Sequence, residues 1–444
     1  MTTRPMSRAR MTTLVVALLA LFAAACGGGD GGETTEDSSA GNGDGAVSGE
    51  LSVLITWTGS EQEAFQGVID GFTEANPDVS VDLVQVPFGE LNTQLTQQYA
   101  SGNAPDVHVA LPGLLRLLSQ QQFLMPLDDR WDQWVDDGWY TDALRQIASV
   151  DGTSYGAWFK GNVNAEIWYR PDTLSELGID VPTTWDDFLA ALEAADADGV
   201  QAIAVGGADQ WPLTQWSDAI LARVAGPEAF NGLIDGSVNW DDPRVVEAFE
   251  VFGQLIEDHF PDNALDLNFG EATCLWVDGR AAFQNQGAFV NLVAPAECDD
   301  SLQPGRDYTF FEMPGFDDPE PAARFISGDL FAVNADTDNP DAAMALVDWL
   351  ASADGQTIWA ERGGFVAPNA EVDPSVYPDD NDRKSAELWP ASPDDPPAVY
   401  DLDDAIGGEI QSTERTALAD FVRDTDVDAF IQRMVTVTEE VRGQ

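Results

Sequence analysis

The sequence is poor in basic residues. Its 444 residues include 20 Lys and Arg against 78 Asp and Glu, which gives a formal net charge of −58. A surface this acidic repels nucleic acid and anionic membrane faces, so we expect no nucleic acid among the partners. We expect the acidity to keep the protein soluble, in high salt or in an acidic medium, but it identifies no ligand.

Histidine and cysteine are also scarce, at two and three residues. His108 and His259 with so few cysteines make a metal site a poor expectation, and we predict no cofactor. The motif H-E-x-x-H and a nucleotide-binding loop are absent. Because the N-terminus predicts export to an oxidising compartment, we predict a disulfide between Cys274 and Cys298, which would contribute about 3 kcal/mol.

The N-terminus has the features of an export signal. Three arginines precede an apolar run over residues 14–25, which is too short for a lasting membrane span. The run ends at Cys26 and resembles a bacterial lipobox, with Ala23 where leucine is usual. We predict a signal peptide over residues 1–25, lipidation of Cys26 and a flexible tether over residues 26–49. An ordinary signal peptide cut after Ala-x-Ala is the alternative, and it also exports the protein.

From residue 51 onward, strand and helix patterns alternate as β-α-β-α-β. This order predicts a mostly parallel sheet with helices on its faces. Ligands of such sheets bind beyond the carboxyl ends of the strands. The candidates at these strand ends are Trp57, Ser60, Glu61 and Phe88. Core packing of Trp57 and helix capping by Ser60 are the open alternatives.

Lys160 is one of only two lysines, and it lies between aromatic residues at the end of an extended segment. We predict a ligand contact there, with a solvated surface lysine as the alternative. After this segment, Gly178 ends a short predicted helix, and Thr184 with Asp187 predicts a capping box for the next helix.

Trp211 and Trp216 flank the start of another predicted helix. Indole faces can stack on the apolar faces of sugar rings, so both are candidate sugar contacts. Burial of both in the core is the alternative.

The stretch from Tyr155 to Phe188 resembles the crossover segment of the family 1 extracellular solute-binding proteins, which serve ABC importers. The resemblance extends in scattered motifs over nearly all of residues 51–440, and their common order carries it. With the tryptophan pair and the two cysteines, the chain looks closest to α-glucoside-type members. Two positions depart from the family pattern, Trp276 for phenylalanine and Phe283 for methionine. The matching motifs are Tyr155-Gly156, Asn164, Trp168-Tyr169, Pro182, Thr184–Phe188, Ser101–Val107, Pro126–Asp129, Gly279–Phe289 and Gly363–Asn369.

The resemblance implies an α/β, two-lobed periplasmic-binding-protein fold of type II topology, with a hinge between the lobes. Lobe I is expected over residues 50–161 plus 328–371, and lobe II over residues 162–327 plus 372–444. Residues 371–400 are expected to form an irregular excursion, followed by helices. The cleft residues that the resemblance adds are Asn164, Gly287, Phe289, Gly328, Asp329 and Phe365.

The expected function is that of a binding lipoprotein for an ABC-type sugar importer, and not of an enzyme. A monomer anchored to the outer face of the cytoplasmic membrane would capture an oligosaccharide or α-glucoside and deliver it to the permease subunits. An exported glycoside hydrolase is one alternative, because 78 carboxylates would hide a catalytic pair. A binding protein for a non-sugar solute such as a polyamine is the other.

Overall fold

The computed structural model describes residues 47–316, 323–392 and 395–443. The predicted signal peptide, the predicted lipidation site at Cys26 and most of the predicted tether lie outside these residues. The first strand begins at Gly49, at the end of the range expected for the tether. None of the helices in the described part of the chain has the length and apolar character of a membrane span.

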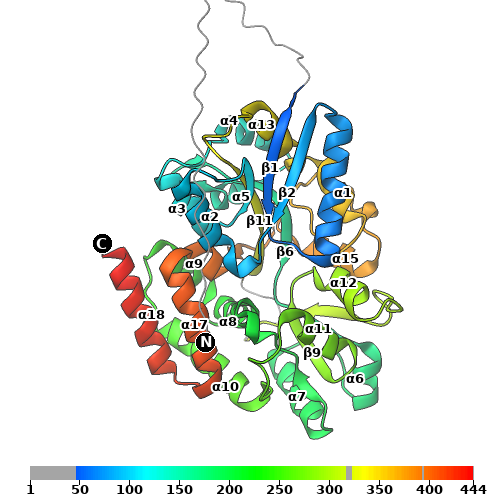
Figure 1. Cartoon of the computed structure of the whole chain (residues 1–444). Helices are drawn as coiled ribbons and strands as arrows, with labels where there is room; N and C mark the ends of the chain where they lie inside the picture. The colour runs from blue at the N-terminus through cyan, green and yellow to red at the C-terminus, as the bar shows by residue number, and fades with distance from the viewer. Residues whose placement is uncertain (1–46, 317–322, 393–394, 444) are drawn as a thin grey trace, which may run out of the picture. The chain divides into compact units, whose positions relative to one another are not determined.

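One sheet has six strands, in the order β12-β11-β3-β1-β2, with β6 paired to β11 (Figure 1). β1 runs parallel to β2 and β3, as predicted, whereas β11 is antiparallel to β3 and β6. The strands are β1 (Gly49–Ile55), β2 (Val79–Gln85), β3 (Val107–Ala110), β6 (Ala157–Val163), β11 (Arg324–Val333) and β12 (Ala398–Tyr400).

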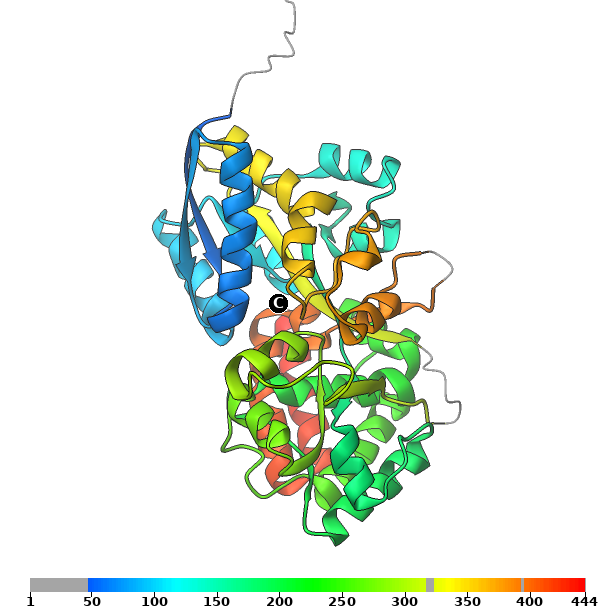
Figure 2. The ribbon, with the colours of Figure 1, turned by 90° about the vertical axis from the view of Figure 1, so that its right-hand side faces the viewer.

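Helices pack on this sheet, and α1 lies beside α13 and α14 (Figure 2). Apolar residues of α1 recur at helical spacing and are buried, which is why this amphipathic segment covers the sheet. The elements of this region are α1 (Gly59–Ala75), η1 (Phe88–Glu90), α2 (Leu91–Ser101), α3 (Pro112–Gln120), α4 (Asp128–Asp136), α5 (Asp142–Ile147), the hairpin β4 (Ser149–Val150) and β5 (Thr153–Ser154), α13 (Pro340–Ala351) and α14 (Ala353–Ala360).

A second sheet has the order β10-β7-β9-β8, and its helices enclose a separate apolar core. Its strands are β7 (Glu166–Tyr169), β8 (Gln201–Ile203), β9 (Ala281–Gln286) and β10 (Thr309–Glu312). The helices and turns of this region are α6 (Pro171–Leu177), α7 (Trp185–Ala197), η2 (Gly207–Asp209), α8 (Trp211–Val224), α9 (Gly226–Asp235), α10 (Pro243–His259), α11 (Phe269–Val277), α12 (Val290–Val293), η3 (Ala294–Cys298), α16 (Leu402–Ile406), α17 (Gly408–Asp424) and α18 (Val427–Arg442).

The two sheets and their cores define a first and a second lobe. The chain crosses between them at Asn164 and Ala165, which separate β6 from β7. β11 also serves both lobes, because Phe325 packs in the second core and the next residue, Ile326, packs in the first. The chain crosses a third time between β12 and α16. The first two crossings lie side by side, because the backbone N–H of Asn164 donates to the carbonyl oxygen of Phe325 at 2.8 Å.

The segment expected to be irregular, residues 371–400, contains a turn, a helix and a strand. These are η4 (Pro374–Val376), α15 (Asp380–Leu388) and β12. The side chain of Asp379 caps α15 by accepting hydrogen bonds from two backbone N–H groups. This cap was not predicted from the sequence, because many other Pro and Asp residues surround it. Tyr377 and Trp389 pack in the first core, although residues 372–444 were expected in lobe II.

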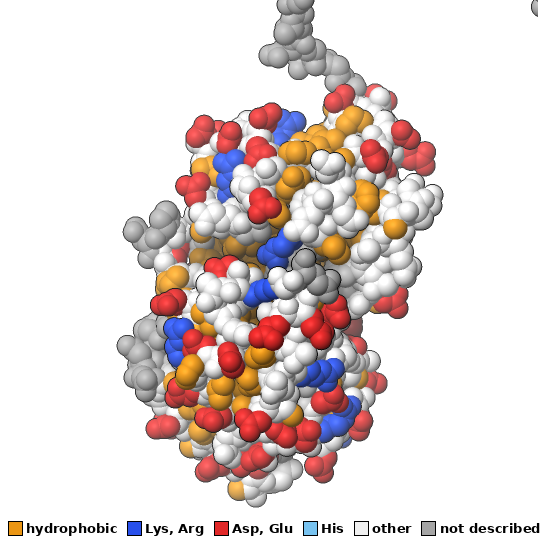
Figure 3. All heavy atoms as spheres, turned by 90° about the vertical axis from the view of Figure 1, so that its left-hand side faces the viewer, with side chains coloured by type: hydrophobic (Ala, Val, Ile, Leu, Met, Phe, Trp, Pro, Cys, Tyr) orange, Lys and Arg blue, Asp and Glu red, His pale blue; other side chains and the backbone are white. Residues whose placement is uncertain are grey.

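Local predictions around the crossover are confirmed. Gly178 ends α6 with a left-handed backbone, and Thr184 with Asp187 forms the predicted capping box of α7. The predicted disulfide between Cys274 and Cys298 is present and joins α11 to the end of η3. Carboxylates are scattered over the face of the molecule drawn in Figure 3, as the composition requires.

Candidate ligand-binding site

A cavity lies where the carboxyl ends of the first sheet face α8, α11 and α17. The space in it, counting its open mouth, is about 780 Å³. Its lining residues are Thr56, Trp57, Glu61, Phe88, Leu111, Lys160, Asn162, Trp211, Thr214, Gln215, Phe269, Phe289, Ser327, Gly328, Asp329, Asp401, Asp403, Asp404 and Arg415.

The predicted edge of the first sheet supplies one wall. Trp57, Phe88 and Leu111 each follow the end of a parallel strand, and all three line the cavity. Glu61 reaches the same wall from the first turn of α1. The parallel order read from the sequence therefore places the cavity, because such strands end at one edge.

Lys160 is buried on β6 and forms an ion pair with Glu61. Its Nζ lies 4.8 Å from the ring centre of Trp359, and the rings of Trp57 and Phe289 lie within 5.8 Å of it. The side chain is 3% exposed, so the alternative of a solvated surface lysine is wrong. Aromatic faces and one carboxylate compensate a cation that burial would otherwise destabilise.

Asp329 on β11 lies beside this pair. Its Oδ2 accepts a hydrogen bond from Nε1 of Trp57 at 3.2 Å. Burial raises the pKa of Asp329 to about 6, while the charge of Lys160 acts to lower it. Gly328 precedes it, and a Cβ there would lie 2.3 Å from the carbonyl oxygen of Lys160, so β6 and β11 approach this closely only with glycine.

Three aromatic rings line the side that the second lobe contributes. Trp211 lies 5.3 Å from Phe269 and 6.0 Å from Phe289 between ring centres, and those two phenylalanines are 5.3 Å apart. Trp211 opens α8 and Phe269 opens α11, so two helix starts and the loop after β9 hold the group together. These rings offer flat apolar faces to a ligand.

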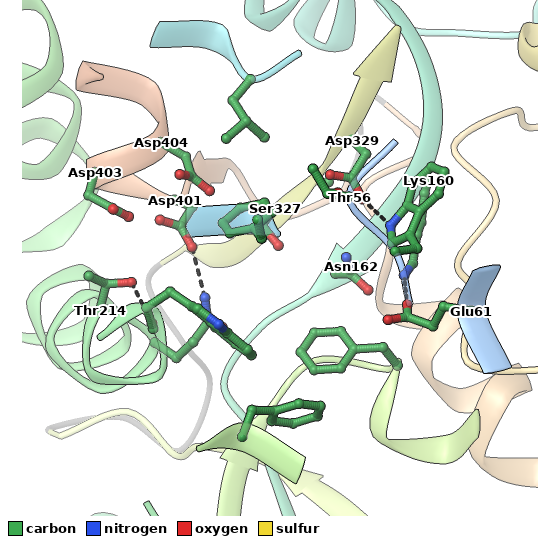
Figure 4. A pocket seen from close by; sticks show the side chains of 18 of the residues that line it. Thr56, Glu61, Lys160, Asn162, Thr214, Ser327, Asp329, Asp401, Asp403 and Asp404 are labelled. Carbon is green, nitrogen blue, oxygen red and sulfur yellow. Dashed lines mark hydrogen bonds and ion pairs between the residues drawn. The ribbon is translucent and has the colours of Figure 1, made fainter. Parts of the chain in front are cut away.

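Acidic residues gather on the opposite side of the cavity from Lys160, as Figure 4 shows for Asp401, Asp403 and Asp404. Arg415 pairs with Asp403 and, at 2.9 Å, with Asp404. Burial acts to raise the pKa of Asp403, but the charge of Arg415 together with hydrogen bonds from Asp401, Arg415 and Gln411 outweighs it, and the pKa is lowered. Burial and the charge of Asp403 raise the pKa of Asp404 to about 8. Nε2 of Gln215 donates to Asp401 at 2.8 Å.

The structure does not bring five of the predicted contacts to the cavity lining. Trp216 is 1% exposed and packs in the second core against Phe260, so the core alternative holds for it. Phe365 is stacked on Trp359 in the first core, behind Lys160. Ser60 lies within the first turn of α1 and does not cap it, because the N-cap position is Thr58.

Asn164 and Gly287 lie close together beside the lobe crossing. Oδ1 of Asn164 accepts a hydrogen bond from Ser327, and a Cβ on Gly287 would meet Asn164 and Phe289. Both positions therefore support lining residues, Ser327 and Phe289, and do not face the cavity themselves.

Sequence reasoning missed the acidic side and its arginine. Asp401, Asp403 and Asp404 belong to one of many acidic runs in the chain, and Arg415 follows more than two hundred residues after the predicted strand ends. Gln215 could have been found, since it lies one helical turn from Trp211 and therefore on the same face of α8. The remaining missed residues are Thr56, Leu111, Asn162, Thr214, Phe269 and Ser327.

The arrangement suits recognition of an intact, polar molecule with apolar faces. Among the described residues, the amide oxygens of Asn162 and Gln215 are buried at the cavity and accept no hydrogen bond from the protein. A buried acceptor without a hydrogen bond is energetically costly. A ligand hydroxyl group that donates to either oxygen would remove this cost. The cavity thus combines hydrogen-bond donors and acceptors with aromatic surfaces.

The chain belongs to the bacterial extracellular solute-binding protein family, whose model matches residues 58–357. It is 27% identical over 351 residues to the osmoprotective compounds-binding protein GgtB of Synechocystis, covering 76% of this chain and 81% of that protein. It is 25% identical over 363 residues to the alpha-glucosides-binding periplasmic protein AglE of Rhizobium meliloti, covering 76% of each.

The fold is also similar to that of a solved chitin oligosaccharide binding protein. The TM-score is 0.77 at 19% sequence identity, covering 89% of this chain and all of that one. The predicted two-lobed α/β fold and the predicted family are therefore confirmed. The protein is a solute receptor and not an enzyme, like the family to which it belongs.

Proposed function

We propose that the protein is the binding lipoprotein of an ABC-type sugar importer and captures an oligosaccharide or α-glucoside between its lobes. The observation that carries this proposal is the cavity in which Trp57, Phe88, Trp211, Phe269 and Phe289 surround hydrogen-bonding side chains. Sugars need both kinds of contact, since their rings present apolar faces and a hydroxyl rim. The names of AglE and of the chitin oligosaccharide receptor support a carbohydrate ligand.

In this proposal the rings of Trp211 and Phe289 stack on a pyranose face. Asn162 and Gln215 accept hydrogen bonds from hydroxyl groups through their unpartnered oxygens. Asp329 accepts another, and it is already oriented by Trp57. The sugar would then hold both lobes together, and the surface made by the bound state is what the permease recognises.

The remaining steps concern transport. Cys26 would carry the lipid that holds the receptor, as a monomer, at the outer face of the cytoplasmic membrane, and the predicted tether over residues 26–49 would let it reach away from the membrane. Delivery of the sugar to the transmembrane permease subunits involves no bond cleavage. Reconstitution of sugar uptake in vesicles with wild-type protein and Cys26→Ser tests the anchor, which should be needed for uptake but not for binding.

A panel of mono-, di- and trisaccharides, measured by thermal shift and then by calorimetry, tests the ligand class. We expect at least one α-linked sugar to raise the melting temperature and to bind one molecule per chain, with no product on chromatography. Spermidine belongs in the panel because the cavity is lined by five carboxylates and two basic side chains. Binding of spermidine and of no sugar would replace the sugar proposal with a cationic solute.

A further inference from the structure

The acidic side of the cavity continues into the protein as a buried cluster. Asp218, Asp401 and Asp403 each place a carboxylate oxygen within 4.8 Å of the other two. Asp218 comes from α8, Asp401 from the end of β12 and Asp403 from α16, and all three are at most 2% exposed. The backbone N–H of Leu402 donates to Asp218 at 2.8 Å and fixes the aspartate against the start of α16.

A fourth buried carboxylate lies near this cluster, and no group among the described residues donates a hydrogen bond to it. Glu414 on α17 is fully buried, and both of its carboxylate oxygens are without a hydrogen-bond partner among the described residues. The negative charges that act on it most are those of Asp218 and Asp403. Asp401 and Asp403 also keep one unpartnered oxygen each.

A solute in the cavity would not reach all of these groups. Asp401 and Asp403 line the cavity, but Asp218 and Glu414 do not. Arg415 is the basic side chain that the described structure pairs with the cluster, and it contacts Asp403 and Asp404. Five carboxylates against one guanidinium leave four formal negative charges in the interior, an arrangement that needs protons or a further cation.

We propose that Asp218, Asp401 and Asp403 bind one calcium-sized divalent cation behind the wall of the ligand cavity, with the buried, unpartnered carboxylate of Glu414 adding negative charge beside the site. An all-oxygen set of carboxylates is what Ca²⁺ prefers, at 2.3–2.6 Å from each oxygen. Carboxylate oxygens that lie within 4.8 Å of one another can reach a single ion at these distances. The ion would join α8, the end of β12 and α16, and it would hold Asp401 and Asp403 in the cavity wall.

The test is a calorimetric titration of chelator-treated, full-length protein with CaCl₂ at pH 7.5 in 0.5 M NaCl, together with thermal shift. High salt is essential, because a surface of net charge −58 attracts divalent ions without a specific site. We expect saturable binding of one Ca²⁺ per chain and a rise in melting temperature, with Mg²⁺ at the same ionic strength producing a smaller rise.

Glu414→Gln and Asp401→Asn should each weaken Ca²⁺ binding by on the order of tenfold or more. Glu409→Gln is the matched control, because Glu409 is an exposed carboxylate on the same helix, α17. A response that does not saturate, or one that Glu409→Gln reduces as much as Glu414→Gln does, assigns the effect to the surface and overturns the proposal. If the wild-type protein shows no response to Ca²⁺, the proposal is overturned as well. Protons shared among the carboxylates would then compensate the buried negative charge. None of these outcomes depends on which solute the cavity binds.

Discussion

Lys160 and Glu61 form an ion pair between β6 and the first turn of α1, at the wall of the ligand cavity. The lysine side chain is 3% exposed and the glutamate 18%, so water screens the pair only from the side of Glu61. Asp329 is close enough that the charge of Lys160 acts to lower its pKa against the effect of burial. One buried cation therefore compensates two carboxylates.

Replacement of Lys160 by methionine should lower the free energy of unfolding by about 2–3 kcal/mol, less than for a fully buried pair because Glu61 is partly exposed. The loss arises because Glu61 and Asp329 then lie in the wall without a cation. Urea unfolding at pH 7.5 measures it. The double variant Lys160→Met with Glu61→Gln should recover part of the loss, and additive effects would contradict the coupling.

Trp211 and Trp216 should respond to alanine substitution in opposite ways. Trp211→Ala removes a cavity wall, so sugar affinity should fall about tenfold or more with little change in stability. Trp216→Ala empties a position in the second core, so stability should fall by about 3–5 kcal/mol while affinity of the folded protein changes by less than about twofold. Calorimetry and denaturant unfolding on both variants separate the two roles, and equal loss of affinity would contradict them.

His108 should make stability depend on pH. It is fully buried, with Nε2 2.8 Å from the Tyr99 hydroxyl, and burial lowers its pKa to about 4. The unfolded chain, with a histidine pKa near 6.5, binds more protons between pH 6.5 and 4. The free energy of unfolding therefore falls as pH falls through this window, by at most about 3 kcal/mol.

His108→Gln should lack this contribution. Because the other carboxylates titrate in both proteins, the informative quantity is the wild-type minus variant stability at pH 7.5, 5.5 and 4.5. That difference should shrink steadily towards low pH. A constant difference would show that His108 does not titrate as its burial requires.

The disulfide should stabilise the fold without forming part of the cavity. Cys274 and Cys298 are 24 residues apart, and a loop of that length predicts about 3 kcal/mol. Cys274→Ser with Cys298→Ser should lose this amount in urea unfolding. Reduced wild-type protein should match the double variant, and a further loss in the variant on adding reductant would point to another cause.

The sequence predicted the fold well where local signals and chain order agree. Strand ends at Trp57 and Phe88 follow from a β-α-β-α-β order, and Lys160 was notable for its rarity. The prediction that Trp211 and Trp216 both contact the sugar overlooked that residues five apart on a helix point about 140° from each other. Helical geometry alone therefore argued against both rings facing one ligand.

Other parts of the site could not have been predicted from one sequence. Asp401 and Asp403 are two among 78 acidic residues, and only the tertiary fold brings them to Gln215 and Arg415. The burial of Glu414 is equally invisible, since its neighbours on α17 include exposed charged residues. Burial in this region depends on packing between α8, α16 and α17 and not on local sequence.

Neighbouring residues of β11 belong to different cores, with Phe325 in the second lobe and Ile326 in the first. Unfolding of either core would disturb the backbone of β11, on which the other core also depends. Heating should therefore give one calorimetric transition, with equal van't Hoff and calorimetric enthalpies, although each lobe is large enough to melt alone. A receptor built this way loses both halves of its binding surface together.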